Sequence, residues 1–94
     1  MSGEKISSVE YSTKYIRSFK KLPPPIQAKA REKEMLFIID PFTARLETHK
    51  LHGKLQDYWA YSVDYKYRVI FRFLNGTSAL FFDIGLHPIY RDSE

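Results

Sequence analysis

Apolar residues recur at every second position from residue 57 almost to the end of the chain. Three stretches show this alternation, DYWAYSVD, KYRVIFRF and TSALFFDIG, and all are rich in aromatic and β-branched residues. This period and composition are typical of β-strands. The pair Asn75-Gly76 separates the last two stretches and favours a two-residue hairpin turn. The chain must therefore form an antiparallel sheet, one face of which needs an apolar cover.

The hairpin turn assigns the strand side chains to the two faces of this sheet. With Leu74 opposite Thr77, one face is nearly all apolar and is expected under a layer of helices; its residues are Tyr67, Val69, Phe71, Phe73, Leu80, Phe82 and Ile84. Arg68 and Arg72 then lie on the open face. Any even-length turn near residues 64–66 adds three further side chains to that face, those of Trp59, Tyr61 and Val63. Such a face is either a binding surface or an amphipathic surface closed by the segment 40–56.

The first forty residues predict a short strand and a helical hairpin. KISSVEYS is a candidate edge strand, and Ser12 is a suitable N-cap for a helix with one apolar stripe, formed by Tyr15, Ile16, Phe19 and Leu22. Prolines at 23–25 end this helix, and the last of them fits the first turn of a second helix over about 25–39. The apolar end of the second helix is expected to be buried: Met35, Leu36, Ile38 and Ile39. Residues 40–56 are expected to form a long connection.

Length and composition limit the class of protein. Ninety-four residues suffice for one domain with a thin core, which the aromatic content of 16% enlarges. The chain has no cysteine, which excludes disulfides and cysteine-based zinc sites. It has no apolar stretch of membrane-spanning length and no apolar leader, so we expect a soluble, cytoplasmic protein without a membrane partner. Residues 1–31 hold seven Lys/Arg and two Asp/Glu, which indicates either an acidic or polyanionic partner or merely a solubilising helix surface.

Three short motifs follow one another across residues 46–90. A Leu-x-Gly occurs in LETHKLHGKL, an arginine opens the strand YRVIFRF, and a Gly-x-His-x-x-Tyr closes the last strand in DIGLHPIY. In this order and spacing, in a small basic chain, they resemble the RelE/ParE superfamily of toxins from type II toxin–antitoxin modules. The resemblance implies an α+β fold of the order β-α-α-β-β-β, in which an N-terminal short strand and a helical hairpin pack on one face of a twisted, mainly antiparallel sheet. Residues 1–94 would form a single toxin domain.

The resemblance also implies an activity. RelE- and YafQ-like members are metal-independent endoribonucleases that cut messenger RNA in the ribosomal A site, whereas ParE-like members poison DNA gyrase without cutting. Metal-free cleavage needs a base for the ribose 2′-OH, an acid for the leaving 5′ oxygen and a cation for the phosphorane, roles that His and Arg suit best. No cofactor or metal is implied. The implied partners are messenger RNA, on the ribosome, and a cognate antitoxin, which the basic first third predicts to be acidic.

The motif positions give four residues catalytic roles. Arg68 matches the third-strand arginine that stabilises the phosphate, with a cross-strand ion pair to Asp83 as the structural alternative. His87 matches the histidine that closes the fourth strand and is expected to be a general acid or base. His49, ahead of nearby His52, is the candidate for the second such group. Tyr90 matches a terminal aromatic residue that holds the ribose or stacks on a base, or else anchors the C-terminus.

The open face supplies the expected RNA contacts. Where RelE has two strand lysines, this chain has Trp59 and Tyr61, whose rings can stack on bases; Arg72 and Lys54 complete the set. Gly85 is expected to turn the strand end, so that residues 87–90 return over this face. Three functions stay open: a ribosome-dependent endoribonuclease, a non-catalytic gyrase inhibitor of the ParE kind, and an RNA-binding module without cleavage. The two histidines favour the first, because a gyrase inhibitor needs no proton-transfer pair.

Overall fold

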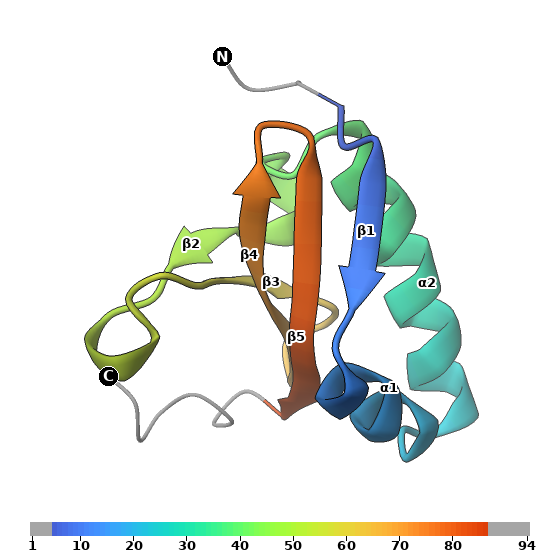
Figure 1. The fold of residues 1–94 in the computed structure, drawn as a ribbon. Coiled ribbons are helices and arrows are strands. Elements are labelled where there is room, and N and C mark those ends of the chain that lie inside the picture. The colour runs from blue at the N-terminus through green and yellow to red at the C-terminus, as the bar shows by residue number, and fades with distance from the viewer. Residues whose placement is uncertain (1–4, 87–94) are drawn as a thin grey trace.

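A computed structural model of the protein describes residues 5–86, and Figure 1 shows its elements. The helices are α1 (Thr13–Lys20) and α2 (Pro24–Ile39), with two short 3-10 helices, η1 (Ala44–Leu46) and η2 (Gly53–Leu55). The strands are β1 (Ser8–Tyr11), β2 (His49–Lys50), β3 (Trp59–Ser62), β4 (Tyr67–Asn75) and β5 (Ser78–Leu86). The predicted α+β architecture is confirmed. One short strand, β2, is added within the segment that the sequence predicts to be a connection.

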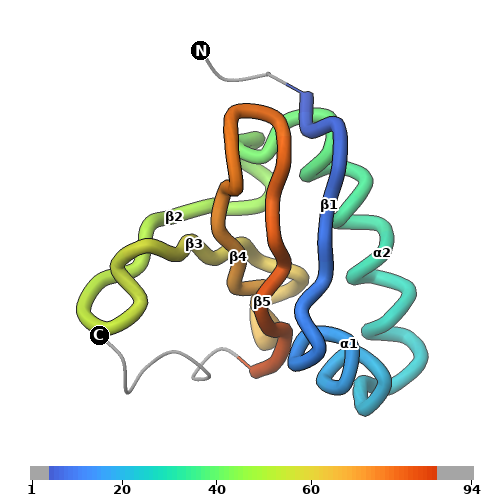
Figure 2. The backbone as a smooth tube through the Cα atoms, in the orientation of Figure 1, coloured from blue at the N-terminus to red at the C-terminus, as the bar shows by residue number. Residues whose placement is uncertain are grey.

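The five strands form one sheet in the order β1-β5-β4-β3-β2. β1 runs parallel to β5, and the other neighbouring pairs are antiparallel. Figures 1 and 2 show β1 passing in front of α2, α1 at the lower end of β1 and β5, and the β2–η2 segment extending to the side away from the helices. The mainly antiparallel sheet with its helical layer is the arrangement that the sequence predicts.

Local signals start and join the two helices. Ser12 is the N-cap of α1, and its Oγ accepts a hydrogen bond of 2.9 Å from the backbone N–H of Tyr15. Pro24 takes the first position of α2, where its missing N–H costs no helical hydrogen bond. The Gln27 side chain then links the hairpin, because its Nε2 donates to the carbonyl of Phe19, in the last turn of α1, and to that of Leu22, just after the helix. Among the described residues, no helix combines the length and apolar character that crossing a membrane requires.

The main core is a cluster of aromatic rings between the helices and the sheet. Phe37 of α2 is fully buried, and its ring lies 4.8–5.3 Å from those of Tyr61, Phe71 and Phe81, measured between centroids. Helix α2 buries a single stripe, as expected of a helix that covers one sheet face. The expectation that its whole apolar end is buried is therefore wrong: the exposed residues include Met35, Ile38 and Ile39.

The β3–β4 connection has an odd number of residues, and this overturns the predicted face of β3. Ser62 pairs with Arg68, and the N–H of Val63 bonds to the carbonyl of Tyr67, which leaves three residues, 64–66, in the loop. The loop is held by Asp64, whose Oδ1 accepts the backbone N–H groups of residues 66 and 67 at 2.8 Å each. An odd loop reverses the alternation that an even one would give. Three residues predicted on the open face thus lie on the helix side: Trp59, Tyr61 and Val63.

The β4–β5 hairpin departs from the predicted register as well. Asn75 pairs with Ser78, so the turn residues are Gly76 and Thr77 rather than Asn75 and Gly76. Register shifts follow between Phe73 and Asn75 and between Ile70 and Phe71. As a result the core receives Ala79 and Phe81, whereas Leu80 and Phe82, predicted under the helices, belong to the opposite face. The predicted burial of Val69, Phe71 and Ile84 is confirmed.

A second, smaller core lies on the face that the helices leave open. Leu51, Ala60 and Ile70 are buried there, and Leu55, Tyr58 and Phe82 pack against them. Leu51 and Leu55 come from the segment around β2 and η2, which therefore folds over part of this face. The alternative in which the segment 40–56 closes the open face therefore holds for this part of it.

Candidate functional site

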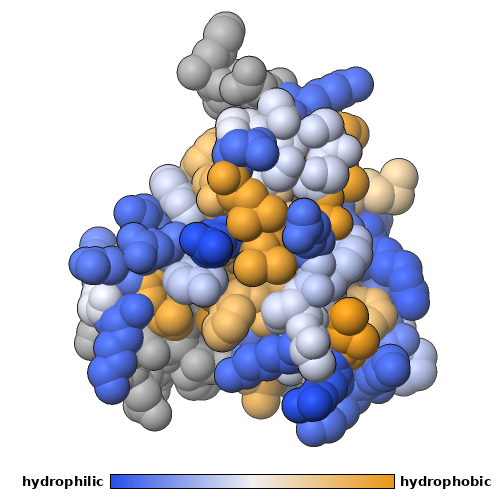
Figure 3. Space-filling model, in the orientation of Figure 1, coloured by the Kyte–Doolittle hydropathy of each residue, from blue (hydrophilic) through white to orange (hydrophobic). Residues whose placement is uncertain are grey.

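The open face of the sheet presents an apolar strip between hydrophilic flanks. Figure 3 views this face and shows the strip along its middle, over β4 and β5. The strand register places Arg68, Ile70 and Arg72 of β4 on the open face. Leu80 of β5 pairs with Arg72, and Glu10 of β1 pairs with Leu80. The face thus combines guanidinium groups with apolar surface, and a carboxylate marks its β1 edge.

Arg68 is on the open face, as predicted, and is partly buried. Its Nη1 donates to the backbone carbonyls of Asp64 and Tyr67, the latter at 3.1 Å, so the β3–β4 loop fixes the guanidinium. Both protons of Nη1 are used in this way. Nε and Nη2, which form the edge that binds a phosphate in two parallel hydrogen bonds, have no partner among residues 5–86. The side chain is therefore preorganised for a phosphate.

The alternative role of Arg68, an ion pair with Asp83, is wrong. Asp83 pairs in register with Ile70, and its carboxylate is engaged by α1 instead. Ser18 Oγ donates to Asp83 Oδ1 at 2.7 Å, and Lys14 Nζ lies 3.8 Å from Oδ2. Asp83 thus anchors α1 to β5 and leaves Arg68 available.

His49 lies in β2, opposite Ala60, and is exposed on the same face. Its Nδ1 lies 3.0 Å from the carbonyl oxygen of Glu47. Because a carbonyl can only accept, Nδ1 carries the proton, and Nε2 is the acceptor nitrogen of the neutral ring. His49 is two strands away from β4 and two residues out of line with Arg68. In ideal sheet geometry their Cα atoms are therefore about 12 Å apart. His52 is exposed just before η2.

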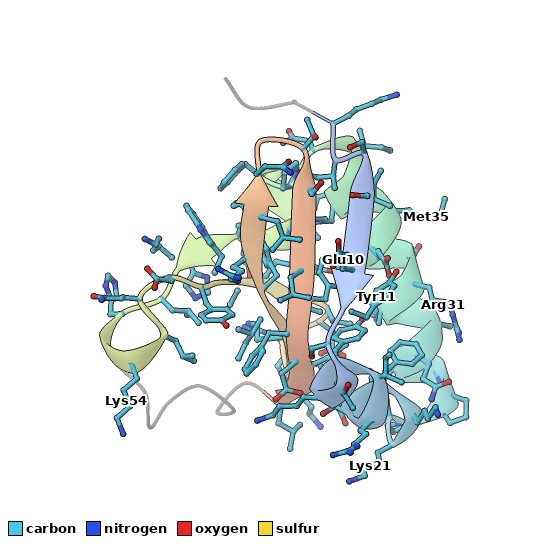
Figure 4. All side chains as sticks on the ribbon, viewed as in Figure 1. Glu10, Tyr11, Lys21, Arg31, Met35 and Lys54 are labelled. Carbon is cyan, nitrogen blue, oxygen red and sulfur yellow. The ribbon has the colours of Figure 1, made fainter. Side chains whose placement is uncertain are left out.

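The four predicted RNA contacts divide between the two sides of the sheet. Arg72 and Lys54 are exposed, and Figure 4 shows Lys54 on the η2 loop, far across the view from α1. Tyr61 is fully buried against Phe37. Trp59 is half-buried on the helix side, where its ring meets Phe42 at 5.3 Å. The odd β3–β4 loop therefore removes both aromatic residues from the candidate site.

Two predicted catalytic residues, His87 and Tyr90, lie outside the described residues, so their roles remain predictions. The expected turn at Gly85 is wrong, because β5 continues through Leu86. Gly85 pairs with Arg68, and Leu86 with Tyr67. The last described residue of β5 is thus next to the strand position of Arg68.

An aromatic pair that the sequence analysis did not select occupies the open face. The rings of Tyr58 and Phe82 lie 5.1 Å apart between centroids, and both are half-buried. Lys14 Nζ lies 5.5 Å from the centroid of the Phe82 ring. Phe82 was missed because the register shift between Phe73 and Asn75 reverses the faces predicted for Leu80 and Phe82. Tyr58 could have been found from the sequence if the β3–β4 loop were known to be odd. Trp59 then faces the helices, and alternation puts its neighbour Tyr58 on the open face.

A separate recess of about 250 Å³ lies between α1, α2 and β1. Its lining is aromatic with charged ends: Tyr11, Tyr15, Ile16, Phe19, Lys20, Arg31 and Glu34. The Tyr11 hydroxyl donates to Glu34 Oε2, and partial burial together with this bond raises the pKa of Tyr11 to about 12. Burial, and then the Glu34 charge, raise the pKa of Tyr15 well above its ordinary value. None of the predicted catalytic or RNA-binding residues within 5–86 lines this recess, so it is a second candidate surface.

Metal ligands are not gathered anywhere in the described part of the chain. Within residues 5–86, no three His, Cys, Asp or Glu side chains come together in a group that could hold a metal ion. The open face offers a ligand guanidinium, ammonium, imidazole and aromatic side chains, with the Glu10 carboxylate at its β1 edge.

Comparison with known proteins finds likeness in structure but not in sequence. No protein-family model matches the chain, and no curated protein matches it. The toxin–antitoxin complex RelBE2 from Mycobacterium tuberculosis contains a chain that superposes with a TM-score of 0.77 and 20% identity, over 93% of this chain and 98% of that one. YafQ from E. coli strain BL21(DE3) gives a TM-score of 0.71 and 20% identity, over 84% and 91%. A YoeB/ParE toxin from Agrobacterium tumefaciens gives 0.72 and 13%, over 85% and 98%. The protein therefore has the fold of the RelE/ParE-like toxins.

Proposed function

We propose that this protein is the toxin of a type II toxin–antitoxin module and that it cuts messenger RNA on the ribosome without a metal ion. The observation that supports this most is the way in which Arg68 is held by hydrogen bonds on the open face of a RelE/ParE-like fold. Its Nη1 is held by two backbone carbonyls, and Nε and Nη2 form an edge suited to a phosphate.

The proposed reaction uses the ribose of the RNA as nucleophile. His49 accepts the 2′-OH proton at Nε2, the atom that its hydrogen bond to the Glu47 carbonyl leaves as the acceptor. The 2′ oxygen attacks the phosphorus, and Arg68 stabilises the negative charge of the phosphorane. The bond to the 5′ oxygen then breaks, and His87 gives that oxygen a proton. The products are a 2′,3′-cyclic phosphate and a free 5′-OH.

Expression in a bacterium tests this proposal. Induction of the wild-type chain is expected to arrest growth and to produce cuts in translated messages, mapped by primer extension. Arg68→Ala and His87→Ala are each expected to reduce cutting by about 10²–10⁴-fold, the usual contribution of one proton carrier or one transition-state cation. Lys29→Ala, on the outer surface of α2, is the matched control and should cut normally.

Two outcomes would contradict the endoribonuclease. A folded Arg68→Ala protein that cuts at the wild-type rate would remove the guanidinium from the mechanism. Intact messages together with stalled DNA replication would identify a gyrase inhibitor of the ParE kind instead.

The proposed partner is an acidic antitoxin segment that binds along α1. The recess beside this helix has aromatic walls, and Lys20 and Arg31 supply cations at its rim, with the Arg31 guanidinium 5.0 Å from the centre of the Phe19 ring. An amphipathic segment with an apolar anchor and flanking carboxylates would match both features. Ile16 is an exposed member of the lining. In co-expression, Ile16→Glu is therefore expected to remain toxic but to escape neutralisation by the cognate antitoxin.

A further inference from the structure

The Tyr58–Phe82 pair owes its position to a defect in the sheet. Phe71 pairs with Phe81, and the preceding residue Ile70 pairs with Asp83, so Phe82 is an extra residue on β5. Such a bulge re-aims one side chain, and bulges are over-represented next to functional sites. Phe82 lies on the open face at this bulge, whereas its neighbour Phe81 is in the aromatic core. Phe82 covers Ile70 there, together with Tyr58, whose ring comes from the residue just before β3.

Lys14 of α1 lies over the Phe82 ring because β1 is shorter than β5, so that α1 begins beside the middle of β5. β1 ends at Tyr11, opposite Phe81. The backbone N–H of Ser12 then bonds to the carbonyl of Phe81, and its Oγ donates to the carbonyl of Phe82. α1 therefore begins beside the bulge, and its first turn brings Lys14 over the Phe82 ring. The Lys14 side chain is 62% exposed, so its ammonium group is accessible to a ligand.

Arg72 supplies a second cation next to the same rings. Trp59, the first residue of β3, pairs with Phe71, so Tyr58 comes level with Arg72. Arg72 is exposed on the open face. The open face thus carries an aromatic pair with two exposed cations from different elements beside it. The Asp83 carboxylate lies beside Lys14, with Oδ2 3.8 Å from Nζ, and accepts a hydrogen bond from Ser18 Oγ; a phosphate would bind the exposed side of the ammonium group.

We propose that Tyr58 and Phe82 form the platform on which one unpaired base of the RNA stacks, and that Lys14 and Arg72 bind the phosphates on either side of that base. An aromatic surface with flanking cations is the usual design for single-stranded nucleic acid, because every base has a π face and every nucleotide a phosphate. The inference rests on the proposed function, and it names the residues that hold the substrate rather than those that cut it. The acidic Glu10 on β1 sets the limit of the bound strand on that side.

Direct binding tests the platform independently of cleavage. The probe is a fluorescein-labelled, 2′-O-methyl RNA of eight nucleotides, which cannot be cut by attack of the 2′-OH, and the readout is fluorescence anisotropy at 50–200 mM salt. Tyr58→Leu and Phe82→Leu, which retain an apolar cover for Ile70, are each expected to weaken binding by about 5–100-fold, the usual value of one stacked base. The salt dependence of binding should stay unchanged in both.

Three further variants complete this measurement, one that tests a phosphate contact and two that are controls. Lys14→Gln should lower the slope of log K against log salt by about 0.7, the value for one phosphate contact on a single strand. Phe82→Tyr keeps an aromatic ring and should bind like the wild type. Tyr65→Leu removes an 81% exposed ring from the β3–β4 loop, away from the platform, and should also leave binding unchanged.

A reporter inside the platform gives a second readout if the leucine variants do not fold. The chain has a single tryptophan, Trp59, so Phe82→Trp in a Trp59→Phe background places the only indole at the bulge. Stacking of a base is expected to quench its fluorescence as the RNA is added. Wild-type affinity in folded Tyr58→Leu and Phe82→Leu, no quenching, or no binding of the RNA by the wild type would each overturn the platform. Weakened binding by these variants in a protein that cuts no message would uphold the platform and refute the nuclease.

Discussion

Tyr61 provides a direct test of which residues form the core. Its ring is fully buried and packs on Phe37, Phe71 and Phe81, with centroids 5.3–5.9 Å away. Its hydroxyl oxygen has no hydrogen-bond partner among the described residues. Burial also raises the pKa of this phenol well above its ordinary value, so the group is neutral. The side chain therefore contributes through its ring, while its hydroxyl group costs stability.

We expect Tyr61→Phe to stabilise the protein by up to about 2 kcal/mol. An unpaired buried hydroxyl costs about 1–3 kcal/mol, and removing it recovers that amount. The space left by one oxygen atom is smaller than a methyl group, whose cavity costs about 1 kcal/mol, so the gain exceeds the loss. In a domain of this size each kcal/mol changes the melting temperature by about 4–8 °C. Tyr61→Ala, which removes the ring, should instead destabilise by about 3–5 kcal/mol.

Urea and thermal unfolding followed by circular dichroism measure both effects. Tyr65→Phe is the matched control, since this tyrosine is exposed and its hydroxyl should contribute less than about 0.5 kcal/mol. A Tyr61→Phe protein less stable than the wild type by more than about 1 kcal/mol would show that the hydroxyl has a partner. A Tyr61→Ala protein of wild-type stability would return the residue to the surface and reinstate the even β3–β4 loop.

Three other consequences of the structure can be measured. Ser12→Ala removes the N-cap of α1 and the hydrogen bond to the Phe82 carbonyl, and it should lower the free energy of unfolding by about 1 kcal/mol or somewhat more; an unchanged urea midpoint would contradict this. Because the pKa values of Tyr11 and Tyr15 are raised, the folded state holds these protons more tightly than the unfolded state. The resulting stability is complete below about pH 10 and is lost as the pH rises towards 12, so the urea midpoint should fall over this range, and less steeply in Tyr15→Phe. The antitoxin should bind more weakly as salt increases, and an affinity independent of salt would exclude the proposed contact with Lys20 and Arg31.

The order of elements could be predicted from the sequence because each has a local signal. Ser12 caps α1, prolines separate the helices, and alternating aromatic residues mark β3 to β5. Strand β2 could not be predicted in this way, since a strand of two residues has no periodicity, and it exists only because it pairs with β3. The burial of Phe37 rather than its aliphatic neighbours likewise depends on how α2 is rotated against the sheet.

The assignment of faces failed at two turns, each for a specific reason. At the hairpin, Asn75 Oδ1 accepts the backbone N–H of Thr77 at 2.8 Å, and a register shift between Phe73 and Asn75 then changes the pairing of β4 with β5 by one residue. At the other turn, the side chain of Asp64 closes a loop of three residues. A shift of one residue reverses every side chain of a strand. Alternation alone therefore gives two sets of residues, but it does not say which set faces the helices.

The same reversal explains why the open face keeps an aromatic character although Trp59 and Tyr61 leave it. Aromatic residues stand at 58, 59 and 61, so a reversed alternation turns residues 59 and 61 to the helix side and leaves Tyr58 for the open face. On β5 the adjacent phenylalanines have the same effect: Phe81 enters the core, and Phe82 lies on the opposite side. Lys14 is different, because its place over Phe82 follows from where β1 ends and α1 begins, a tertiary relation without a local signal. The prediction of a basic and aromatic face thus holds, although two of its aromatic residues are exchanged for their neighbours and one of its cations comes from a helix.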